Sequence, residues 1–321
     1  MNKKILVIGD IILDEYIDGD YKRLATETGV PLFSISNTNY MLGGAGNVAT
    51  NISTTGINTS FIGVLGNDKN SKRCIELLHK NTIDTSMLCI DNNWKTPKKT
   101  RYMVDENQVF RSDSEEQNIL SRRTEKSILK KLSCRIRDFE LLVIVDYCQG
   151  LITPYLSQQI TSLAQKYHKK VIADSKAPNL CHFSGDYLIK TNCKELEIAS
   201  QMACNTLENI VYAARNIINS CNCNYVLTTW SEKGMVLVSK SSVQHISCTD
   251  TSSVVCVIGA GDTVTAYFSI GMINELSLEQ CLLLSREAAE IAISLPKTAI
   301  VPFSCIVKYF YTLKQMNCHN S

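Results

Sequence analysis

The stretch 252–263 reads Ser-Ser-Val-Val-Cys-Val-Ile-Gly-Ala-Gly-Asp-Thr, and a mostly apolar run from Val264 to Ile273 follows it. This pattern predicts a helix that begins at the Gly-Ala-Gly turn. The first N–H groups of a helix have no partner within it and lie at the positive end of the helix dipole, where a phosphate can bind. Asp262 then has two interpretations: it caps the helix, or it is a base beside a phosphate cradle.

The composition of the 321-residue chain is that of a globular α/β protein of one large domain or two. A formal net charge of +2 argues against a surface built for nucleic acid. The fourteen cysteines contain no Cys-x-x-Cys pair, which predicts small apolar residues of a reduced cytosolic protein. The apolar run Ile5 to Ile8 is too short for a signal peptide, and we expect no membrane span.

Apolar runs alternate with helical patterns along most of the chain. The runs at 5–8, 141–145 and 171–174 are apolar on both faces and predict buried parallel strands between layers of helices. Three predicted helix starts lie between such segments: Thr153-Pro154, Asn205 with Glu208, and Ser277 with Gln280.

The alternation of side chains within 17–40 and 95–111 predicts a small antiparallel sheet outside the main layer. Its cations Lys99, Arg101 and Arg111 either form a solvated face or neutralise an anionic substrate. The sheet would leave an apolar face uncovered, so we expect a homodimer through this lid.

Polar residues follow several predicted strands. Asp14 lies just past the first strand, where open α/β sheets place ligand-contacting loops. Asn47 and Asn51, four residues apart after Gly43-Gly44, share one helix face and suit a polyhydroxylated ligand. The pair Asn192 and Glu195 is either a helix cap or a carboxylate facing a hydrated Mg²⁺.

These motifs, in this order, resemble the ribokinase-like carbohydrate kinases, the PfkB family, from Gly9-Asp10 to about Val301. Within that family four stretches look most like the D-glycero-D-manno-heptose 7-phosphate kinases, which are often fused to a nucleotidyltransferase that we do not expect in this chain. These stretches are Gly9-Asp10-x-x-Leu13-Asp14-x-Tyr16, Gly43-Gly44-Ala45-Gly46-Asn47-Val48-Ala49-x-Asn51, Thr96-Pro97-x-Lys99-Thr100-Arg101 and Ser231-Glu232-x-Gly234-Met235.

The resemblance implies a three-layer α/β/α sandwich with a mostly parallel central sheet and a small antiparallel β lid, formed by residues 1–321 as a single kinase domain. It implies that Asp262 takes the proton of the acceptor hydroxyl and that the N–H groups of Gly259, Ala260 and Gly261 hold the transferring phosphoryl group. The other implied contacts are Asp14, Gly43, Gly44, Asn47 and Asn51 to the sugar, Asn192, Thr229, Ser231 and Gly234 to ATP, and Glu195 with Asn192 to Mg²⁺.

A substrate that already carries a phosphate requires cations, and the candidates are Lys99, Arg101, Arg111 and Lys176. The chain departs from the family before Gly259, where Cys256 and Ile258 replace an Asp and a Thr. In relatives that region helps to bind a monovalent cation, so a thiol and an alkyl group argue against activation by potassium. Arg286 and Glu290 likewise replace an Asn and a Gly near the nucleotide.

The leading prediction is a cytosolic, ATP- and Mg²⁺-dependent kinase of a sugar phosphate, with heptose 7-phosphate phosphorylated at O1 as the substrate. We expect neither nucleic acid nor membrane as a partner. The alternatives are a kinase of another sugar and a weakly active or non-catalytic binding protein on the same fold. A Rossmann dehydrogenase is disfavoured because no Gly-x-Gly-x-x-Gly follows the first strand.

Overall fold

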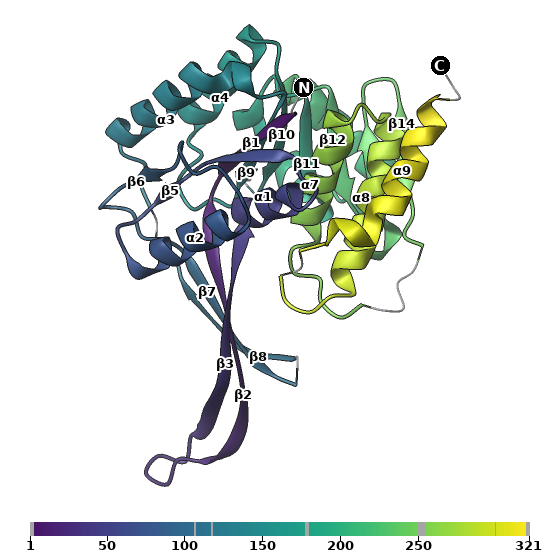
Figure 1. Ribbon diagram of the computed structural model, residues 1–321. Helices are drawn as coiled ribbons and strands as arrows, with labels where there is room; N and C mark the ends of the chain where they lie inside the picture. The colour runs from purple at the N-terminus through teal and green to yellow at the C-terminus, as the bar shows by residue number, and fades with distance from the viewer. Residues whose placement is uncertain are drawn as a thin grey trace.

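The computed structural model describes residues 3–105, 107–116, 118–176, 180–249, 254–298 and 300–318. A sheet of eight strands forms its centre (Figure 1). The pairs from β4 through β12 are parallel, whereas β13 and β14 are antiparallel to their neighbours. In spatial order the strands are β14 (Val243–Ile246), β13 (Met235–Val238), β12 (Tyr225–Thr229), β11 (Leu188–Asn192), β10 (Lys170–Ser175), β9 (Leu141–Asp146), β1 (Lys4–Gly9) and β4 (Asn58–Ile62).

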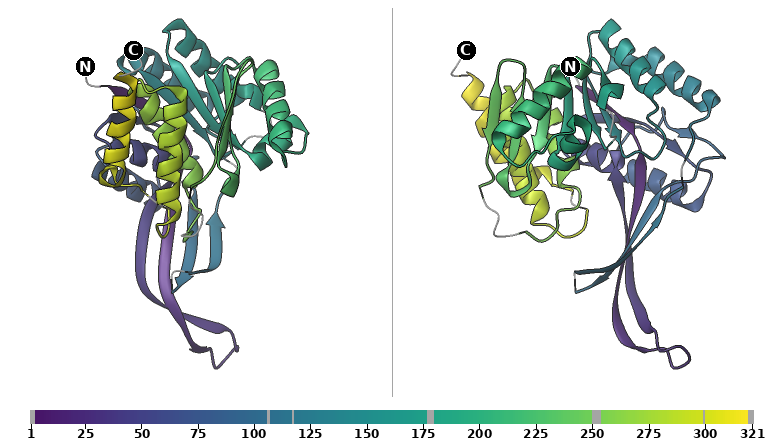
Figure 2. Two further views of the ribbon diagram at one scale, coloured as in Figure 1. Left: turned by 90° about the vertical axis from the view of Figure 1, so that its right-hand side faces the viewer. Right: turned by 180° about the vertical axis from the view of Figure 1, so that it is seen from behind.

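Helices cover both faces of this sheet (Figure 2). The first face packs against α1 (Ala45–Ser53), α2 (Lys69–Lys80), α7 (Ala260–Ile273), α8 (Leu278–Ile293) and α9 (Phe303–Cys318). The second packs against α3 (Arg122–Arg135), α4 (Pro154–Lys166), α5 (Cys193–Ser200) and α6 (Leu207–Cys221). Short 3₁₀ turns lie at η1 (Ile136–Asp138), η2 (Leu180–Phe183) and η3 (Ser231–Lys233).

The sequence of the buried strands explains why two cores form. In β1, Ile5 and Val7 belong to the core under α7, while Leu6 and Ile8 belong to the core on the opposite face. Successive side chains of a strand point to opposite faces, so an uninterrupted apolar run supplies both cores at once. The predicted three-layer α/β/α sandwich is confirmed.

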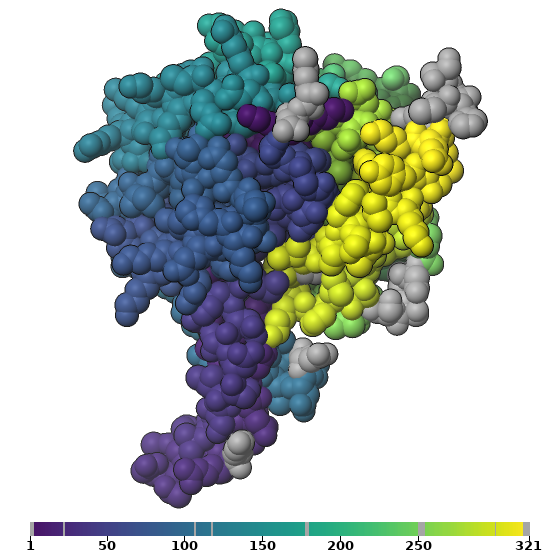
Figure 3. Space-filling view, viewed as in Figure 1, coloured from purple at the N-terminus to yellow at the C-terminus, as the bar shows by residue number. Residues whose placement is uncertain are grey.

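The lid is a separate four-stranded sheet that projects from the body (Figure 3). It consists of β3 (Pro31–Gly44), β2 (Ile11–Leu24), β7 (Lys98–Val104) and β8 (Asn107–Ser114), in that order. The hairpins β2–β3 and β7–β8 are antiparallel as predicted, but β2 and β7 pair in parallel. The parallel pair arises because β2 and β7 both leave the body in the same direction. A further two-stranded sheet joins β5 (Val64–Leu65) and β6 (Cys89–Ile90).

Two of the three predicted helix starts are confirmed. Thr153 accepts a hydrogen bond from the N–H of Leu156 at 3.0 Å, and Ser277 forms a capping box with Gln280. The prediction for Asn205 was wrong by one residue, because the hydroxyl of Thr206 caps α6. Adjacent Asn and Thr side chains are both good caps, so only the path of the chain selects between them. Among the described residues, no helix has the length and apolar character needed to cross a membrane.

Candidate active site

The carboxyl ends of the parallel strands meet at one edge of the sheet, next to the first turn of α7. Strand β9 ends at Asp146, β10 at Ser175 and β11 at Asn192, and these three strands are neighbours. Open α/β sheets bind ligands at this edge. The topology therefore brings residues from distant parts of the chain to one place beside Asp262.

Asp262 is buried, and two side chains donate hydrogen bonds to its carboxylate. The amide of Asn47, from α1, donates to Oδ2 at 2.9 Å, and the hydroxyl of Tyr147, just after β9, donates to Oδ1 at 2.7 Å. Burial raises the pKa of Asp262 to about 6, and the charge of Asp174 adds to the rise, while the two hydrogen bonds lower it. The carboxylate is thus held in one orientation with a proton affinity suited to a base near neutral pH.

The geometry at the start of α7 shows that Asp262 does not cap this helix. Gly259 is the N-cap residue, with φ at 83°, and no side chain in the described part of the chain caps this helix. A left-handed φ of this size favours glycine. The carboxylate of Asp262 contacts Asn47 and Tyr147 instead, so the first-turn N–H groups of α7 have no side-chain cap.

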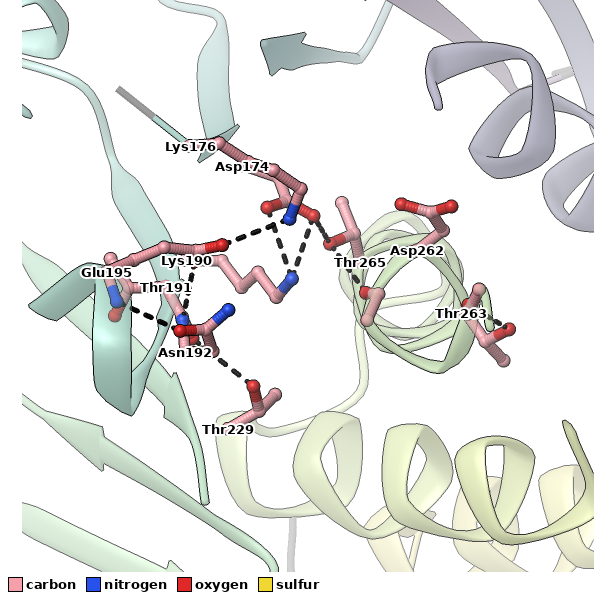
Figure 4. Close-up of polar contacts among 12 residues, drawn as sticks. Asp174, Lys176, Lys190, Thr191, Asn192, Glu195, Thr229, Asp262, Thr263 and Thr265 are labelled. Carbon is pink, nitrogen blue, oxygen red and sulfur yellow. Dashed lines mark hydrogen bonds and ion pairs between the residues drawn. The ribbon is translucent and has the colours of Figure 1, made fainter. Parts of the chain in front are cut away.

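A buried ion pair lies beside the same helix start (Figure 4). Lys190 on β11 donates to both oxygens of its cross-strand neighbour Asp174, at 3.0 and 3.1 Å. Thr265 on α7 also donates to Asp174, at 2.6 Å. A Cβ atom added to Gly261 would lie 2.9 Å from the Nζ of Lys190, so this ammonium group lies directly against the first turn of α7.

Three residues of this site, Tyr147, Asp174 and Lys190, were not predicted from the sequence. One signal was available, because Lys190 is a charged residue that directly follows the apolar pair Leu188-Ile189 in the middle of β11, two residues before Asn192. A buried lysine requires a partner. No spacing pattern points to Tyr147, because only the sheet places it beside Asp262.

On the lid side, Asp14 is the centre of a buried polar group. Arg101 donates to its Oδ1 at 2.7 Å, and Thr298 donates to its Oδ2 at 2.9 Å. A Cβ atom added to Gly43 would lie 2.6 Å from that Oδ2, so only glycine allows this approach. Gly44, the next residue, ends β3 immediately before α1.

Asn51 lies one helical turn behind Asn47 and is fully buried. Its amide donates to the side-chain oxygen of Asn47 at 3.1 Å, and its own oxygen accepts from the N–H of Val301 at 3.0 Å. Asn51 thereby orients the amide that Asn47 directs at Asp262.

The four predicted phosphate-binding cations fall into two groups. Lys99, Arg101 and Arg111 share one face of the lid, because Lys99 and Arg101 are two residues apart on β7 and Arg101 is the cross-strand partner of Arg111. Lys99 pairs with Glu115 at 3.0 Å and Arg111 pairs with Asp113. The buried Nε of Arg101 has no hydrogen-bond partner among the described residues.

Lys176 belongs to the other group, at the carboxyl edge of the sheet. It contacts Glu195 at 3.0 Å and lies over the ring of Tyr147. Glu195 and Asn192 form a reciprocal cap of α5, with bonds of 2.9 and 2.7 Å, so the capping interpretation is confirmed.

A metal at this edge would find few protein ligands. No three His, Cys, Asp or Glu side chains among the described ranges are grouped closely enough to hold a metal ion. Mg²⁺ in phosphoryl-transfer sites is held by one or two carboxylates, with waters and substrate phosphates as the remaining ligands. Glu195 and Asn192 offer oxygen ligands of the right kind for such an ion, but these oxygens already accept hydrogen bonds from Lys176 and within the cap of α5, so an ion would use their remaining lone pairs.

A cavity of about 670 Å³ opens between α7, α8 and the turn after β12. Its size lies in the range of small-molecule sites. Asn192, Thr229, Ser231 and Gly234, the four predicted ATP contacts, all line it, as do Ala260 and Gly261 at the start of α7.

The segment before Gly259 lacks the expected polar pair. The N–H of Cys256 donates to the carbonyl of Ile293 at 3.0 Å, which attaches this segment to the end of α8. Cys256 offers a thiol and Ile258 an alkyl group, and hard monovalent cations prefer oxygen ligands.

We predict that Asp262→Asn stabilises the protein at pH 8. The pKa of Asp262 is about 6 in the folded protein and 3.8 ordinarily, so the stability that this group contributes is complete below pH 3.8 and is lost as the pH rises through about 6. A shift of this size corresponds to a gain of at most about 3 kcal/mol in the free energy of unfolding of the variant. Urea denaturation at pH 4 and pH 8 measures it.

Asp105→Asn, at an exposed turn with φ at 46°, is the control for this prediction and should leave the midpoint unchanged at both pH values. Equal midpoints for the parent and Asp262→Asn at pH 8 would contradict the burial argument.

Comparisons with known proteins agree on one family. The family described as pfkB family carbohydrate kinase matches residues 2–303. The bifunctional protein HldE of Aliarcobacter butzleri is 30% identical over 316 residues, which are 98% of this chain and 66% of that protein. The bifunctional protein HldE of Helicobacter pylori is 32% identical over 292 residues, or 91% and 63% of the two chains. The chain thus spans about two thirds or less of these relatives.

Solved structures show the same fold at low identity. Ribokinase of Arabidopsis thaliana, complexed with ribose and ATP, has a TM-score of 0.73 at 20% identity and covers 96% of this chain and 98% of its own. Phosphofructokinase-2 of Escherichia coli, in complex with potassium, has a TM-score of 0.79 at 19% identity, with coverage of 98% and 100%. The ribokinase-like fold is confirmed, and the chain belongs to the pfkB family of carbohydrate kinases.

Proposed function

We propose that this chain transfers the γ-phosphate of ATP to a hydroxyl group of a sugar phosphate, with Asp262 as the base. The observation that carries the proposal is the buried carboxylate of Asp262, held by Asn47 and Tyr147 at the start of α7. A cavity of about 670 Å³ reaches the same helix start and is lined by all four predicted nucleotide contacts. We treat the chain as one kinase unit with its lid.

Proton removal is the task of Asp262. With a pKa of about 6, its carboxylate is mostly ionised at neutral pH and is more basic than an exposed Asp. The bonds from Asn47 and Tyr147 fix its plane, so a sugar hydroxyl that enters beside them meets an oriented acceptor.

Charge stabilisation is the task of the helix start and of Lys190. The N–H groups at Gly259, Ala260 and Gly261 would face a phosphoryl group that approaches along the helix axis, and the phosphoryl oxygen would replace the long bond of 3.4 Å that the N–H of Ala260 donates to the carbonyl of Val257. The ammonium of Lys190 lies against Gly261 and is held there by Asp174. When bound near Glu195 and Asn192, Mg²⁺ neutralises charge on the phosphates.

The proposed sugar contacts lie on the lid side of the site. Asp14, positioned by Arg101 and Thr298, and Asn47, oriented by Asn51, offer acceptors and donors to ring hydroxyls. A Cβ atom at Gly43 would meet the carboxylate of Asp14 and one at Gly44 the carbonyl of Asp10, so these two glycines support the sugar site by leaving room for Asp14 and for the backbone at Asp10.

We infer that the substrate is D-glycero-D-manno-heptose 7-phosphate, phosphorylated at O1. Two features support this choice: the four sequence stretches that resemble heptose 7-phosphate kinases, and the three cations on one face of the lid. Lys99 and Arg111 are already paired with carboxylates, so the phosphate of the substrate would have to compete with Glu115 and Asp113. The unpaired Nε of Arg101 offers a further donor.

A second candidate is a weakly active or non-catalytic sugar-binding protein. The replacement of an acidic residue and a hydroxyl by Cys256 and Ile258 favours it, because the segment that leads into the helix start loses oxygen ligands.

The assay that decides between these functions measures ADP release on a panel of sugars and sugar phosphates that includes the heptose 7-phosphate. We expect turnover to be highest with the heptose 7-phosphate and to fall by roughly 10²–10⁴-fold in Asp262→Asn. Calorimetric binding without turnover on any sugar would favour the binding protein. Turnover of Asp262→Asn within a few-fold of the parent would refute the role of the base.

The acidic limb of the pH–rate profile tests the hydrogen bond from Tyr147. This bond lowers the pKa of Asp262, so Tyr147→Phe should raise that pKa and move the limb above its parent position near pH 6. The exposed Tyr155→Phe on α4 is the matched control. An unchanged limb in Tyr147→Phe would show that Asp262 does not set it.

We further propose that two copies associate through their lids. Apolar side chains of the lid are exposed, among them Leu24, Ile35 and Phe110. Edge-to-face and tilted ring contacts run from Tyr21 through Phe33 and Tyr102 to Phe110. Monomeric soluble proteins rarely expose such contiguous patches.

Light scattering at micromolar concentration should therefore give the mass of a dimer for the parent chain and of a monomer for Ile35→Asp. Ile198→Asp on α5 is the control, since its side chain is 62% exposed against 61% for Ile35. A monomeric parent would exclude the association.

A further inference from the structure

Arg286 on α8 is the most unusual charged residue of the nucleotide cavity. It lines the cavity, and its side chain is only 14% exposed. Its Nε is buried and has no hydrogen-bond partner among the described residues. The carboxylates of Glu287 and Glu290 are each 3.8 Å away, too far for a hydrogen bond.

Glu290 forms an ion pair with Arg286 at 3.8 Å but no hydrogen bond, because its two carboxylate oxygens accept shorter bonds from Thr249. One oxygen accepts from the N–H of Thr249 at 2.7 Å and the other from its hydroxyl at 2.5 Å. Glu290 thus attaches the segment at Thr249 to α8 and leaves the guanidinium of Arg286 available to a ligand. An arginine this buried without good partners costs free energy, which a ligand contact would recover.

The position of Arg286 along α8 indicates which part of a nucleotide it meets. Helices α7 and α8 form a hairpin, so the end of α8 lies beside the start of α7, and Ile293 lines the cavity together with Ala260 and Gly261. Arg286 precedes Ile293 by seven residues, or about 10 Å of helix. If the phosphates lie at Gly261, Arg286 lies at the nucleoside end.

A guanidinium group offers only donors. A 6-oxopurine such as guanine presents two adjacent acceptors, N7 and O6, whereas adenine presents the N7 acceptor beside the N6 donor. A bidentate contact from arginine therefore suits a 6-oxopurine and not adenine.

We propose that Arg286 is a base-recognition residue that lets this site use 6-oxopurine nucleoside triphosphates, GTP and ITP, as phosphate donors at least as well as ATP. The inference rests on the proposed function, because it requires that the cavity hold a nucleoside triphosphate. It goes beyond that function by naming the base class and the residue that selects it.

The experiment measures binding of the β,γ-imido analogues of ATP, GTP and ITP by calorimetry, without any sugar. The proteins are the parent, Arg286→Asn, Arg286→Lys and the control Arg215→Asn, which lies exposed on α6. We expect the affinity ratio of GTP to ATP analogue to fall about tenfold in both Arg286 variants. The control should keep the parent ratio.

Arg286→Lys keeps the charge and the aliphatic part of the side chain but loses the planar, bidentate donors of the guanidinium group. It therefore remains informative if Arg286→Asn does not fold. The affinity of the ITP analogue should fall together with that of the GTP analogue in the Arg286 variants, because both bases carry the N7 and O6 acceptors. A GTP preference that ITP does not share would overturn the inference, and so would an unchanged ratio in the Arg286 variants. Failure of all three analogues to bind the parent would instead refute the proposed nucleotide site.

Discussion

The site depends on one costly constraint, the burial of a carboxylate where three segments of the chain meet. Asp262 comes from the start of α7, Asn47 from α1 and Tyr147 from the end of β9. Removing a charge from water is unfavourable unless donors replace the water, and these two side chains supply them. The pKa of Asp262 stays raised because these donors offset only part of the cost, and a raised pKa suits the group to the proposed role of base.

Two buried ion pairs lie near the carboxylate of Asp262, one on the sheet side and one on the lid side. Lys190 with Asp174 places an ammonium group against the first turn of α7, and Arg101 with Asp14 fixes an acceptor under the lid. Both pairs are buried, so breaking either one by removing a single partner would leave an uncompensated charge. The site is therefore rigid on its sheet side, whereas the lid carries the more exposed charges.

The departures from the family pattern lie in or next to the cavity beside α8, and Asp262 is retained. Cys256 is hydrogen-bonded to the end of α8, and Arg286 and Glu290 lie one to two turns earlier on the same helix. Asp262, Asn47 and Gly259 all retain the expected residue types. The chemistry of proton removal and the recognition of the phosphate donor can thus change separately, because different elements carry them.

Much of this protein follows from its sequence alone. Uninterrupted apolar runs such as 5–8 and 141–145 dictate parallel strands covered on both faces, and the Gly-Ala-Gly-Asp turn marks a helix start without a side-chain cap in the described part of the chain. Local patterns of this kind depend on a few neighbouring residues, which is why the caps at Thr153 and Ser277 were also predictable. They contain no information on which distant residues meet.

Only the tertiary structure decided which distant residues meet. It places Tyr147 beside Asp262 and Lys190 beside Gly261. It also places Lys176 beside Glu195, apart from the lid cations, and pairs the two lid hairpins through the parallel strands β2 and β7. Each of these contacts depends on strand order and helix packing, which are properties of the whole sheet. Asp262 could be proposed as the base from its neighbours in sequence, but its raised pKa depends on burial and on Asp174, Asn47 and Tyr147, which only the fold brings to it.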